Sequence, residues 1–486
     1  MDLVISEVAS LLGSASNAQD GVAGSYSIDS RTLVPGALFF ALRGPHFDGH
    51  DFVRAAVERG AVGAVVERDW AASAPANLRS LLIPVTSTVE ALQTLGREVR
   101  RRWGGPLVAI TGSTGKTTTK ELIAAALGTH YPVHKSTGNL NNHLGVPLTL
   151  LGLDRGHQAA VVELGMSHAG EIAQLARIAE PEYGVITNVA PVHLQFFESL
   201  EGISSAKREL IDNLASPGVA VLNYDDVRVR NFRYGLVGRV VTYGFAPEAD
   251  FQAADFRLCL NGPGGAVGSV FRVRVPEGET QVRLPLPGRH NVENALAAIA
   301  VGCLFGVPVQ DVGAALENCT ALPLRTEVIR IANGVTMIND CYNSNPRAME
   351  QMLDLLREWP EVGRRIVIAG EMLELGPSSP EWHRLIGRRC AESGVDWLLA
   401  VQGLSRMFVE GAVEAGMRRE QTRLFDEAGE AGRFCRSILQ PGDVTLVKGS
   451  RGARLEKATE ELLRPWEGNS PTPAGAPEVF RADPKA

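Results

Sequence analysis

A glycine-rich stretch, LVAITGSTGKTTTKEL from Leu107 to Leu122, contains the residues best suited to bind a phosphate group. The pattern predicts an apolar strand, a glycine turn and the first turn of a helix. Such a joint aims free backbone N–H groups at one point, where the helix dipole also favours an anion. Lys116 could reach a β- or γ-phosphate, and the hydroxyl of Thr117 could ligate Mg²⁺.

The spacing of this loop is shorter than usual. The common phosphate loop, G-x-x-x-x-G-K-[ST], would place its first glycine at position 110, which is Ile110. The alternative is therefore a plain strand–turn–helix joint, in which Gly112 and Gly115 only relieve backbone strain. The adjacent Lys116 and Thr117, together with the strand and helix flanks, favour the phosphate site.

Two residues at the ends of other predicted strands have side chains that can bind a metal ion. Glu163 ends the stretch VVE, and His193 follows YGVITNV. Ligands of parallel sheets bind at the carboxyl ends of the strands, so both residues could face the phosphate loop. A solvated acid and a structural histidine are the alternatives, and Glu163 taken alone supports either. Lys207, on a predicted helix, has the local chemistry of an ordinary surface lysine.

Three polar stretches further along suit a ligand but are also explained by local structure. GRHNVENALAA places His290, Asn291 and Asn294 at a helix start, where they suit ribose, base or phosphate contacts and where Asn291 could equally be a cap. NDCYNSNP follows a strand and ends in a turn-forming Asn-Pro. LVKGSRG sets Lys448 and Arg451 in a turn, which suits phosphate or carboxylate as well as solvent. The N-terminal stretches SIDSRTLVPGALFFALRG and FDGHDF are uninformative by spacing alone.

The elements that must position these residues alternate between strands and helices from Leu107 onward. LVAIT, AAVVEL, YGVITNV and GVAVLN are strand candidates separated by helical patterns, which predicts βαβ units and a parallel sheet. Residues 238–287 are rich in strand and turn signals and predict an antiparallel annex to that sheet. After Leu322, VTMIND, RRIVIAG, VDWLLAV and DVTLVKG predict a second doubly wound domain.

Because 486 residues are too many for one ordinary core, two to four domains are expected. The element pattern divides the chain into three α/β regions and a tail. An N-terminal α/β domain covers residues 1–104 and ends at the helix end and turn REVRRRWGGP. A central P-loop domain with a parallel sheet and a smaller antiparallel annex covers residues 105–322. A Rossmann-like C-terminal domain covers residues 323–464. Residues 465–486, rich in proline, glycine and alanine, are predicted to be a disordered tail.

Composition excludes several classes of function. The net charge of −7 without a basic block argues against non-specific nucleic-acid binding. Six cysteines without a C-x-x-C pair indicate neither a disulfide framework nor a zinc knuckle, which fits a reducing cytoplasm. The acidic start MDLVISEVASLLG does not resemble a signal peptide. The uncharged run Ala295–Val309 is shorter than the roughly 20 residues of a membrane span, so it predicts a buried helix. We expect a cytoplasmic monomer without membrane insertion.

Taken together, these stretches resemble the Mur ligase family, ATP-dependent amide-bond-forming enzymes of peptidoglycan synthesis. The phosphate loop of that family has the short form G-x-x-G-K-[ST], which Gly112 to Thr117 supply. The resemblance extends over nearly the whole chain, to about residue 463. The stretches NLNNHLGVPLTLL, DCYNSNP, EMLELG and LVKGSRG resemble the members that add a D-alanyl-D-alanine dipeptide.

Sister members that add the single third residue share the features DSR…PGALFFAL and DGHDF. However, those members have a Thr-Thr-Pro stretch at the place where this chain has Asn141, Asn142 and His143. Their diaminopimelate-selecting Asp-Asn-Pro-Arg is also missing here. The resemblance therefore favours the dipeptide-adding members over a sister ligase with another amino substrate.

The resemblance implies a UDP-sugar-binding N-terminal domain, a central ATPase and a C-terminal Rossmann-like domain. It implies that ATP phosphorylates the terminal carboxylate of UDP-N-acetylmuramoyl-tripeptide. The amine of D-alanyl-D-alanine then attacks the acyl phosphate, giving UDP-N-acetylmuramoyl-pentapeptide, ADP and phosphate. A carboxylate is a poor electrophile, so phosphorylation supplies a leaving group. Mg²⁺, two ions by resemblance, would neutralise the charge that builds up.

Matching positions also imply residue roles. Lys116, Lys207 and His193 would be catalytic, and Lys207 matches a lysine that can be carbamylated, which turns a cation into a carboxylate-like metal ligand. The implied metal ligands are Thr117, Glu163, His193 and Lys207. The implied nucleotide-binding residues are Gly112, Ser113, Thr114, Gly115, Lys116, Thr117, Thr118, Asn291, Asn294, Arg325, Asp340 and Asn343. The implied substrate residues are Ser30, Arg31, Asp48, Gly49, Asn139 and Asn142 for the UDP-sugar, and Lys448, Ser450 and Arg451 in a C-terminal stretch facing the active site.

The chain departs from the family pattern in three places. After His193 it reads Leu-Gln-Phe-Phe, where the family more often has Leu-Glu-x-Phe-Gly, so Phe197 leaves the path of that loop open. Ser344 replaces a common alanine and Glu371 a common aspartate. None of these changes removes a group that the chemistry requires.

Two rival classes remain. A P-loop GTPase or regulatory NTPase switch is disfavoured because the chain lacks an Asn-Lys-x-Asp guanine-reading motif. A nucleotide-binding protein that has lost catalysis is disfavoured because Glu163, His193 and Lys207 are all present.

Overall fold

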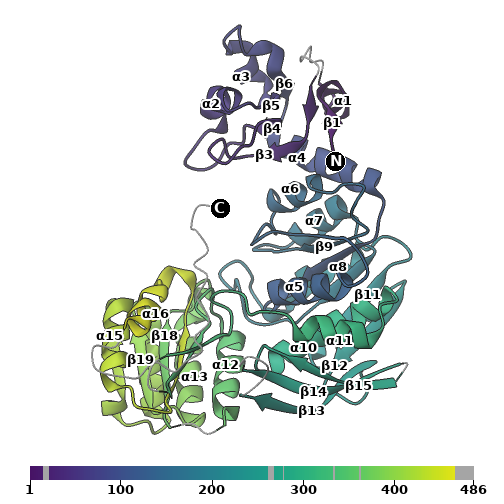
Figure 1. The fold of residues 1–486 in the computed structure, drawn as a ribbon. Coiled ribbons are helices and arrows are strands. Elements are labelled where there is room, and N and C mark those ends of the chain that lie inside the picture. The colour runs from purple at the N-terminus through teal and green to yellow at the C-terminus, as the bar shows by residue number, and fades with distance from the viewer. Residues whose placement is uncertain (15–20, 261–266, 277, 332–333, 361–362, 466–486) are drawn as a thin grey trace.

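A computed structural model describes residues 1–14, 21–260, 267–276, 278–331, 334–360 and 363–465. The predicted tail falls, from residue 466 onward, outside the described residues. Three lobes follow one another along the chain, and the central lobe lies between the N-terminal and C-terminal lobes (Figure 1). Each lobe is built on its own α/β sheet, as the strand–helix alternation predicts.

The N-terminal lobe contains a four-stranded parallel sheet in the order β3-β4-β5-β6. The strands are β3 (Ser25–Ser27), β4 (Ala37–Phe40), β5 (Gly63–Glu67) and β6 (Leu82–Val85). Helices α2 (Val53–Glu58), α3 (Arg68–Ser73) and α4 (Thr88–Trp103) connect them or follow them, and α1 (Ile5–Leu11) lies between the short paired strands β1 (Leu3–Val4) and β2 (Val22–Ala23). The helix end predicted at REVRRRWGGP is confirmed, because α4 ends at Trp103 and Gly104 adopts a left-handed φ of 66°.

The central lobe has a nine-stranded sheet in the order β15-β14-β13-β12-β11-β10-β7-β9-β8. Strands β7 (Leu107–Thr111), β8 (Val133–Lys135), β9 (Ala159–Glu163), β10 (Tyr183–Ile186), β11 (Val219–Asn223), β12 (Arg239–Gly244) and β13 (Phe251–Cys259) pair in parallel. Strands β14 (Gly268–Val275) and β15 (Gly278–Leu284) add antiparallel pairs. The predicted antiparallel annex is therefore a continuation of the parallel sheet.

Helices cover both faces of this sheet. They are α5 (Lys116–Leu127), α6 (Gly145–Leu151), α7 (Glu171–Ala179), α8 (Leu200–Asp212), α9 (Val227–Asn231), α10 (Arg289–Leu304) and α11 (Val309–Glu317). The buried helix predicted for residues 295–309 is wrong in its limits. Helix α10 starts earlier, at Arg289, and ends at Leu304, because Gly306 adopts a left-handed φ of 79° and Pro308 precedes the next helix.

The C-terminal lobe has a six-stranded sheet in the order β16-β17-β21-β18-β19-β20. Its strands are β16 (Glu327–Arg330), β17 (Thr336–Asn339), β18 (Arg365–Gly370), β19 (Trp397–Val401), β20 (Thr422–Phe425) and β21 (Val444–Lys448). Only the edge pair β16–β17 is antiparallel. Helices α12 (Pro346–Glu358), α13 (Ser379–Glu392), α14 (Arg406–Glu414), α15 (Ala428–Ile438) and α16 (Glu456–Leu463) complete the doubly wound fold that VTMIND, RRIVIAG, VDWLLAV and DVTLVKG predict.

Helix α4 connects the first two lobes along the chain and also packs against the central lobe. It lies on α6 and α7 of the central lobe, and Gly96 approaches so closely that a Cβ there would lie 2.8 Å from Pro147. Its buried side chains Leu92, Leu95 and Val99 belong to one apolar cluster that contains residues of both lobes. By contrast, the two sides of the C-terminal sheet have clusters that lie almost wholly within that lobe.

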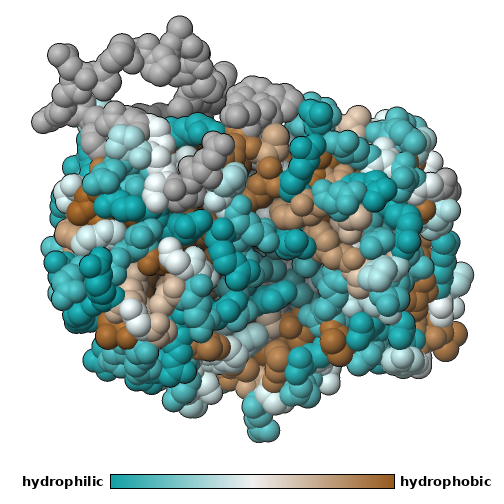
Figure 2. Space-filling model, turned by 90° about the horizontal axis from the view of Figure 1, so that it is seen from below, coloured by the Kyte–Doolittle hydropathy of each residue, from teal (hydrophilic) through white to brown (hydrophobic). Residues whose placement is uncertain are grey.

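The surface seen from below Figure 1 is mostly hydrophilic, with hydrophobic residues in small scattered groups (Figure 2). Among the described residues, no helix is both long and apolar enough to cross a membrane.

Candidate functional site

The phosphate loop lies between β7 and α5 and lines a cavity of about 610 Å³. Its two glycines cannot be replaced without a collision. Gly112 has a φ of 152°, and a Cβ there would lie 1.8 Å from the hydroxyl of Thr187; a Cβ on Gly115, whose φ is 80°, would lie 2.4 Å from the Asn294 side-chain oxygen. The turn of the phosphate loop therefore needs Gly112 and Gly115, and it needs no glycine at position 110.

The start of α5 presents its backbone to the cavity. The N–H of Thr119 donates the first helical bond, to Gly115 at 2.8 Å, and the residues before it line the cavity. The N–H groups of Ser113 and Thr114 instead donate to the backbone and side-chain oxygens of Asn188. The N–H groups that remain for an anion are thus those of the first turn of α5.

Lys116 is the cation of this loop. Its Nζ donates to the carbonyl of Gly112 at 2.9 Å. Burial lowers its pKa, nearby Glu163 opposes that shift, and nearby Arg325 adds to it. A desolvated cation at the wall of a cavity gains free energy when an anion binds beside it.

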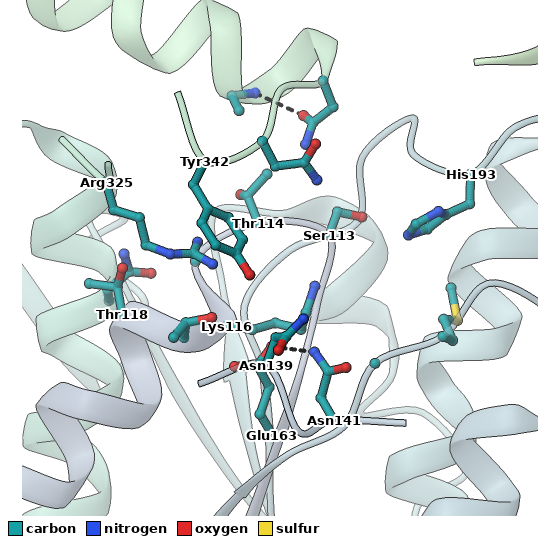
Figure 3. Close-up of a pocket in the computed structure, with 18 of the residues that line it drawn as sticks. Ser113, Thr114, Lys116, Thr118, Asn139, Asn141, Glu163, His193, Arg325 and Tyr342 are labelled. Atoms are coloured by element: carbon teal, nitrogen blue, oxygen red, sulfur yellow. Dashed lines mark hydrogen bonds between the residues drawn. The ribbon is translucent and has the colours of Figure 1, made fainter. Parts of the chain in front are cut away.

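Glu163, at the end of β9, has one carboxylate oxygen without a partner. Its Oε1 accepts a hydrogen bond from the Asn141 amide at 2.8 Å, whereas its Oε2 is buried and has no hydrogen-bond partner (Figure 3). An unpaired carboxylate oxygen is costly to bury unless a cation or donor meets it. The free oxygen therefore fits a metal ion beside Lys116 and Thr117.

His193 lies in the loop after β10 and also lines the cavity. Its Nδ1 contacts Oε2 of Glu374 at 2.5 Å, and Glu374 belongs to the C-terminal lobe. Burial lowers the pKa of His193, the Glu374 carboxylate opposes that shift, and Lys116 and Lys207 add to it.

Lys207 is not a surface lysine, which corrects the expectation from its local sequence. It lies on the buried stripe of α8 with Ile203, Ala206 and Leu210, at the i, i+3, i+4 spacing of one helix face. Burial, and then the charge of Lys116, lower its pKa well below the usual range. No ion pair joins Lys207 to a carboxylate within the part of the chain that the structure describes.

The described residues contain no group of three or more histidine, cysteine, aspartate and glutamate side chains that could hold a metal ion. Mg²⁺ needs no such group, because it is commonly bound through one or two carboxylates together with waters and phosphate oxygens.

Arg325 and Tyr342 approach the phosphate loop from the C-terminal side (Figure 3). The Arg325 guanidinium lies 4.1 Å from the centre of the Tyr342 ring, and Arg451 lies 5.6 Å from it. Both contacts are within cation–π range. The Tyr342 ring therefore contacts two arginines, of which Arg325 lines the cavity.

Asp340 and Lys448 form a largely buried ion pair at 2.5 Å. Asp340 also accepts a hydrogen bond from the N–H of Thr326, and Lys448 donates to the carbonyl of Asn343 at 3.0 Å. The Lys448 side chain is 1% exposed, so a merely solvated turn does not describe LVKGSRG. The pair fixes the turn that contains Tyr342 and Asn343.

Asn291 and Asn294 sit at the start of α10 but do not cap it. The cap is Gly288, and Asn291 instead donates to the carbonyl of Pro287 at 2.9 Å. The side-chain oxygen of Asn294 accepts from Thr119 in α5 at 3.1 Å. The capping alternative for Asn291 is therefore wrong, because the helix begins two residues earlier.

The cavity gathers most of the predicted residues. Those that line it are Ser113, Thr114, Gly115, Lys116, Thr117, Thr118, Asn139, Asn142, Glu163, His193, Asn291, Asn294, Arg325, Asp340, Asn343 and Lys448. Those that do not line it are Gly112, Lys207, Ser30, Arg31, Asp48, Gly49, Ser450 and Arg451.

The four N-terminal residues of that second set lie in another lobe (Figure 1). Arg31 is exposed and pairs with Asp29 at 2.7 Å. Asp48 accepts from the backbone of His50, and Gly49 lies against the backbone of Leu42. Ser450 accepts a hydrogen bond from the N–H of Leu373 and donates one to the carbonyl of Ser344.

Residue-by-residue reasoning missed Asn141, Thr326, Tyr342 and Glu374, whereas His290, which it singled out, does line the cavity. Asn141, Tyr342 and Glu374 stand in stretches that had been singled out, so their polar groups were an available signal. Thr326 has no distinctive spacing. The contact of Glu374 with His193 becomes visible only when two distant segments meet.

The three lobes match three family models in chain order. Residues 24–100 match the Mur ligase family catalytic domain, residues 110–302 the Mur ligase middle domain, and residues 324–451 the Mur ligase glutamate ligase domain. The chain is 34% identical to the UDP-N-acetylmuramoyl-tripeptide–D-alanyl-D-alanine ligase of Bacillus subtilis, over 90% of this chain and 92% of that protein. The ligase of the same name from Escherichia coli is also 34% identical, over 95% and 98%. The chain belongs to the Mur ligase family.

Solved structures of Mur ligases agree with the three-lobe arrangement. A crystal structure of MurF from Acinetobacter baumannii has a TM-score of 0.84 at 30% identity, covering 95% of this chain and 99% of that one. MurF ligase from Thermotoga maritima, crystallised with ADP, has a TM-score of 0.79 at 28% identity, covering 90% and 96%.

The departures from the Mur ligase pattern are accommodated locally. Phe197 is buried in the core of the central lobe, so it anchors the loop that follows His193. Glu371 accepts a hydrogen bond from the N–H of Leu404 at 3.2 Å. Both side chains thus have structural contacts.

Ser344 is the departure with a measurable consequence. Its hydroxyl is buried without a hydrogen-bond partner, whereas its backbone carbonyl accepts from Ser450. Replacing a buried, unpaired hydroxyl by hydrogen removes a desolvation cost of order 1 kcal/mol. We expect Ser344→Ala to raise the free energy of unfolding by about 1 kcal/mol, measured by urea denaturation. A decrease of similar size in the free energy of unfolding would show that the Ser344 hydroxyl makes a stabilising hydrogen bond.

Proposed function

We propose that this Mur ligase uses ATP to join D-alanyl-D-alanine to UDP-N-acetylmuramoyl-tripeptide. The relatives that bear this activity in their names match the chain from end to end. One observation carries the chemistry: a phosphate loop and a buried, unpaired carboxylate oxygen face the same cavity between two lobes. That arrangement suits phosphoryl transfer to a carboxylate.

The phosphates of ATP would lie against the first turn of α5. There they would meet the N–H groups of that turn, and Lys116 would exchange the carbonyl of Gly112 for a phosphate oxygen. A second cavity of about 690 Å³ shares Thr118, Asn291 and Arg325 with the first. We place the ribose and base there, since the space continues directly from the phosphate site.

Thr117, Glu163 and His193 would hold Mg²⁺, with Lys207 as a fourth ligand once carbamylated. Bound Mg²⁺ supplies charge neutralisation on the phosphates. Lys207 suits carbamylation because its lowered pKa favours the neutral amine, the form that adds to carbon dioxide. The product is an anion, which also removes the repulsion between Lys207 and Lys116.

The reaction then has two displacements. An oxygen of the tripeptide carboxylate attacks the γ-phosphorus, the bond to the bridging oxygen breaks, and ADP leaves. The amine nitrogen of the dipeptide attacks the acyl carbon, the carbon–oxygen bond breaks, phosphate leaves and the nitrogen releases a proton. Lys116 and Arg325 stabilise the negative charge of the transferring group, and the converging lobes exclude water that would hydrolyse the acyl phosphate.

We assign the UDP-sugar to the lobe of residues 1–104, with Ser30, Arg31, Asp48 and Gly49 on its surface and Asn139 and Asn142 at the cavity edge. The central lobe, residues 105–322, would be the ATPase domain. The C-terminal lobe, residues 323–464, would close over the bound nucleotide. We further propose that the protein acts as a monomer, and the need for ATP supports a cytoplasmic location.

Substrate dependence tests this proposal. We expect release of ADP and phosphate only when UDP-muramoyl-tripeptide and D-alanyl-D-alanine are both present, measured by a coupled ADP assay. Activity with single amino acids but not with the dipeptide would identify a sister ligase instead. Steady hydrolysis of nucleotide without either substrate would favour an NTPase switch.

A further inference from the structure

The side chain of Glu374 reaches His193 from another lobe. Glu374 lies between β18 and α13, whereas His193 follows β10 of the central sheet. Their side chains meet at 2.5 Å between Oε2 and Nδ1. A second bond runs alongside, from the N–H of Gln195 to the Glu374 carbonyl at 3.2 Å. The two lobes are therefore tied at one point by both side chain and backbone.

This contact determines which nitrogen of His193 can bind a cation. A carboxylate on Nδ1 holds the proton on that nitrogen, so the lone pair is left on Nε2. His193 lines the cavity, and a carboxylate behind a ligating histidine both orients the ring and raises its basicity. The carboxylate that orients His193 thus belongs to the C-terminal lobe, and not to the central lobe that contains His193 itself.

The backbone at His193 is held in an unfavourable conformation. Its φ is 54°, in the left-handed region, which few residues other than glycine adopt without support. The next residue, Leu194, packs against the apolar clusters of both the central and the C-terminal lobes. The C-terminal lobe therefore supports the geometry of the His193 loop.

We propose that Glu374 is a positioning residue that makes the metal-binding readiness of His193 depend on docking of the C-terminal lobe. This rests on the proposed function, in which His193 is a Mg²⁺ ligand. The His193 ring is oriented for metal binding only when the C-terminal lobe, which contributes Arg325, Tyr342 and Lys448, is docked on the central lobe. Metal binding and closure of the lobes are then coupled in both directions.

The test measures Mn²⁺ binding by electron paramagnetic resonance, on the full chain with the β,γ-methylene analogue of ATP. We expect Glu374→Ala to weaken the Mn²⁺ binding that depends on His193 by about tenfold. Glu374→Gln should weaken it less, because its amide oxygen still accepts the Nδ1 proton. Glu198→Gln changes an exposed carboxylate on the same loop and should leave binding unchanged.

A double-variant cycle separates positioning from general damage. In the His193→Ala background, adding Glu374→Ala should cause no further loss of Mn²⁺ affinity. Equal losses in both backgrounds would overturn the inference, as would normal Mn²⁺ affinity in Glu374→Ala. If His193→Ala itself binds Mn²⁺ normally, the metal role of His193 fails, and the inference fails with it. Small-angle scattering should show a more open average shape for Glu374→Ala, and an unchanged shape would contradict the coupling.

Discussion

Lys207→Ala is expected to lower kcat by at least about a thousandfold, because it removes the group that would carry the proposed carbamate ligand and its negative charge. Short carboxylates such as acetate should restore part of the activity by occupying the space left by the carbamate. Steady-state kinetics with and without acetate measure both effects. Full activity without acetate would remove the carbamate role.

The physical basis is the position of Lys207 on the buried stripe of α8. As an uncharged amine it would react with carbon dioxide, and as a carbamate it would add a second anion to that of Glu163 near Lys116. A ¹³C carbamate resonance after equilibration with labelled bicarbonate should appear in the parent protein and vanish in Lys207→Ala. Arg208→Ala, a change at the next position on the solvent side of α8, is the matched control and should retain activity.

Glu163→Gln is the second large effect. The substitution keeps the size of the side chain and its contact with Asn141 but replaces the charged oxygens that a metal ion requires. We expect the Mg²⁺ concentration for half-maximal activity to rise at least tenfold and kcat to fall about a hundredfold. A magnesium titration of the initial rate, at saturating ATP, measures both quantities.

Two controls make this result specific. Glu201→Gln alters an exposed carboxylate at the start of α8 and should leave the titration unchanged. Because Oε2 of Glu163 is already unpaired, Glu163→Gln should not lower the free energy of unfolding by more than about 1 kcal/mol. An unchanged magnesium requirement in a folded Glu163→Gln protein would show that the metal binds elsewhere.

Local patterns predicted the elements well where apolar runs were long and bounded by glycine. The run LVAIT corresponds to the buried strand β7, and Thr187 and Asn294 leave no room for a Cβ on Gly112 and Gly115 of the loop that follows. The short loop looked irregular only against the longer motif. Its contacts come from residues far along the chain, so sequence spacing alone could not show that Gly112 completes the turn.

Burial decided the remaining cases. Lys207 looked ordinary because charge is usually on the surface, and only the packing of α8 against the sheet reveals it as desolvated. Glu374 and Tyr342 reach the site by the meeting of two lobes, and the angle between lobes has no local signal. The resemblance to the Mur ligases supplied Lys207 and Arg325, which reasoning from residue types did not.

The packing of α4 also bears on how the substrate is held during the reaction. Since Gly96 lies tight against Pro147 and one apolar cluster spans both lobes, the N-terminal sheet and the phosphate loop can turn relative to each other only by exposing part of that cluster to water. We therefore expect the distance between a UDP-sugar bound on that sheet and the phosphate loop to change little during the reaction.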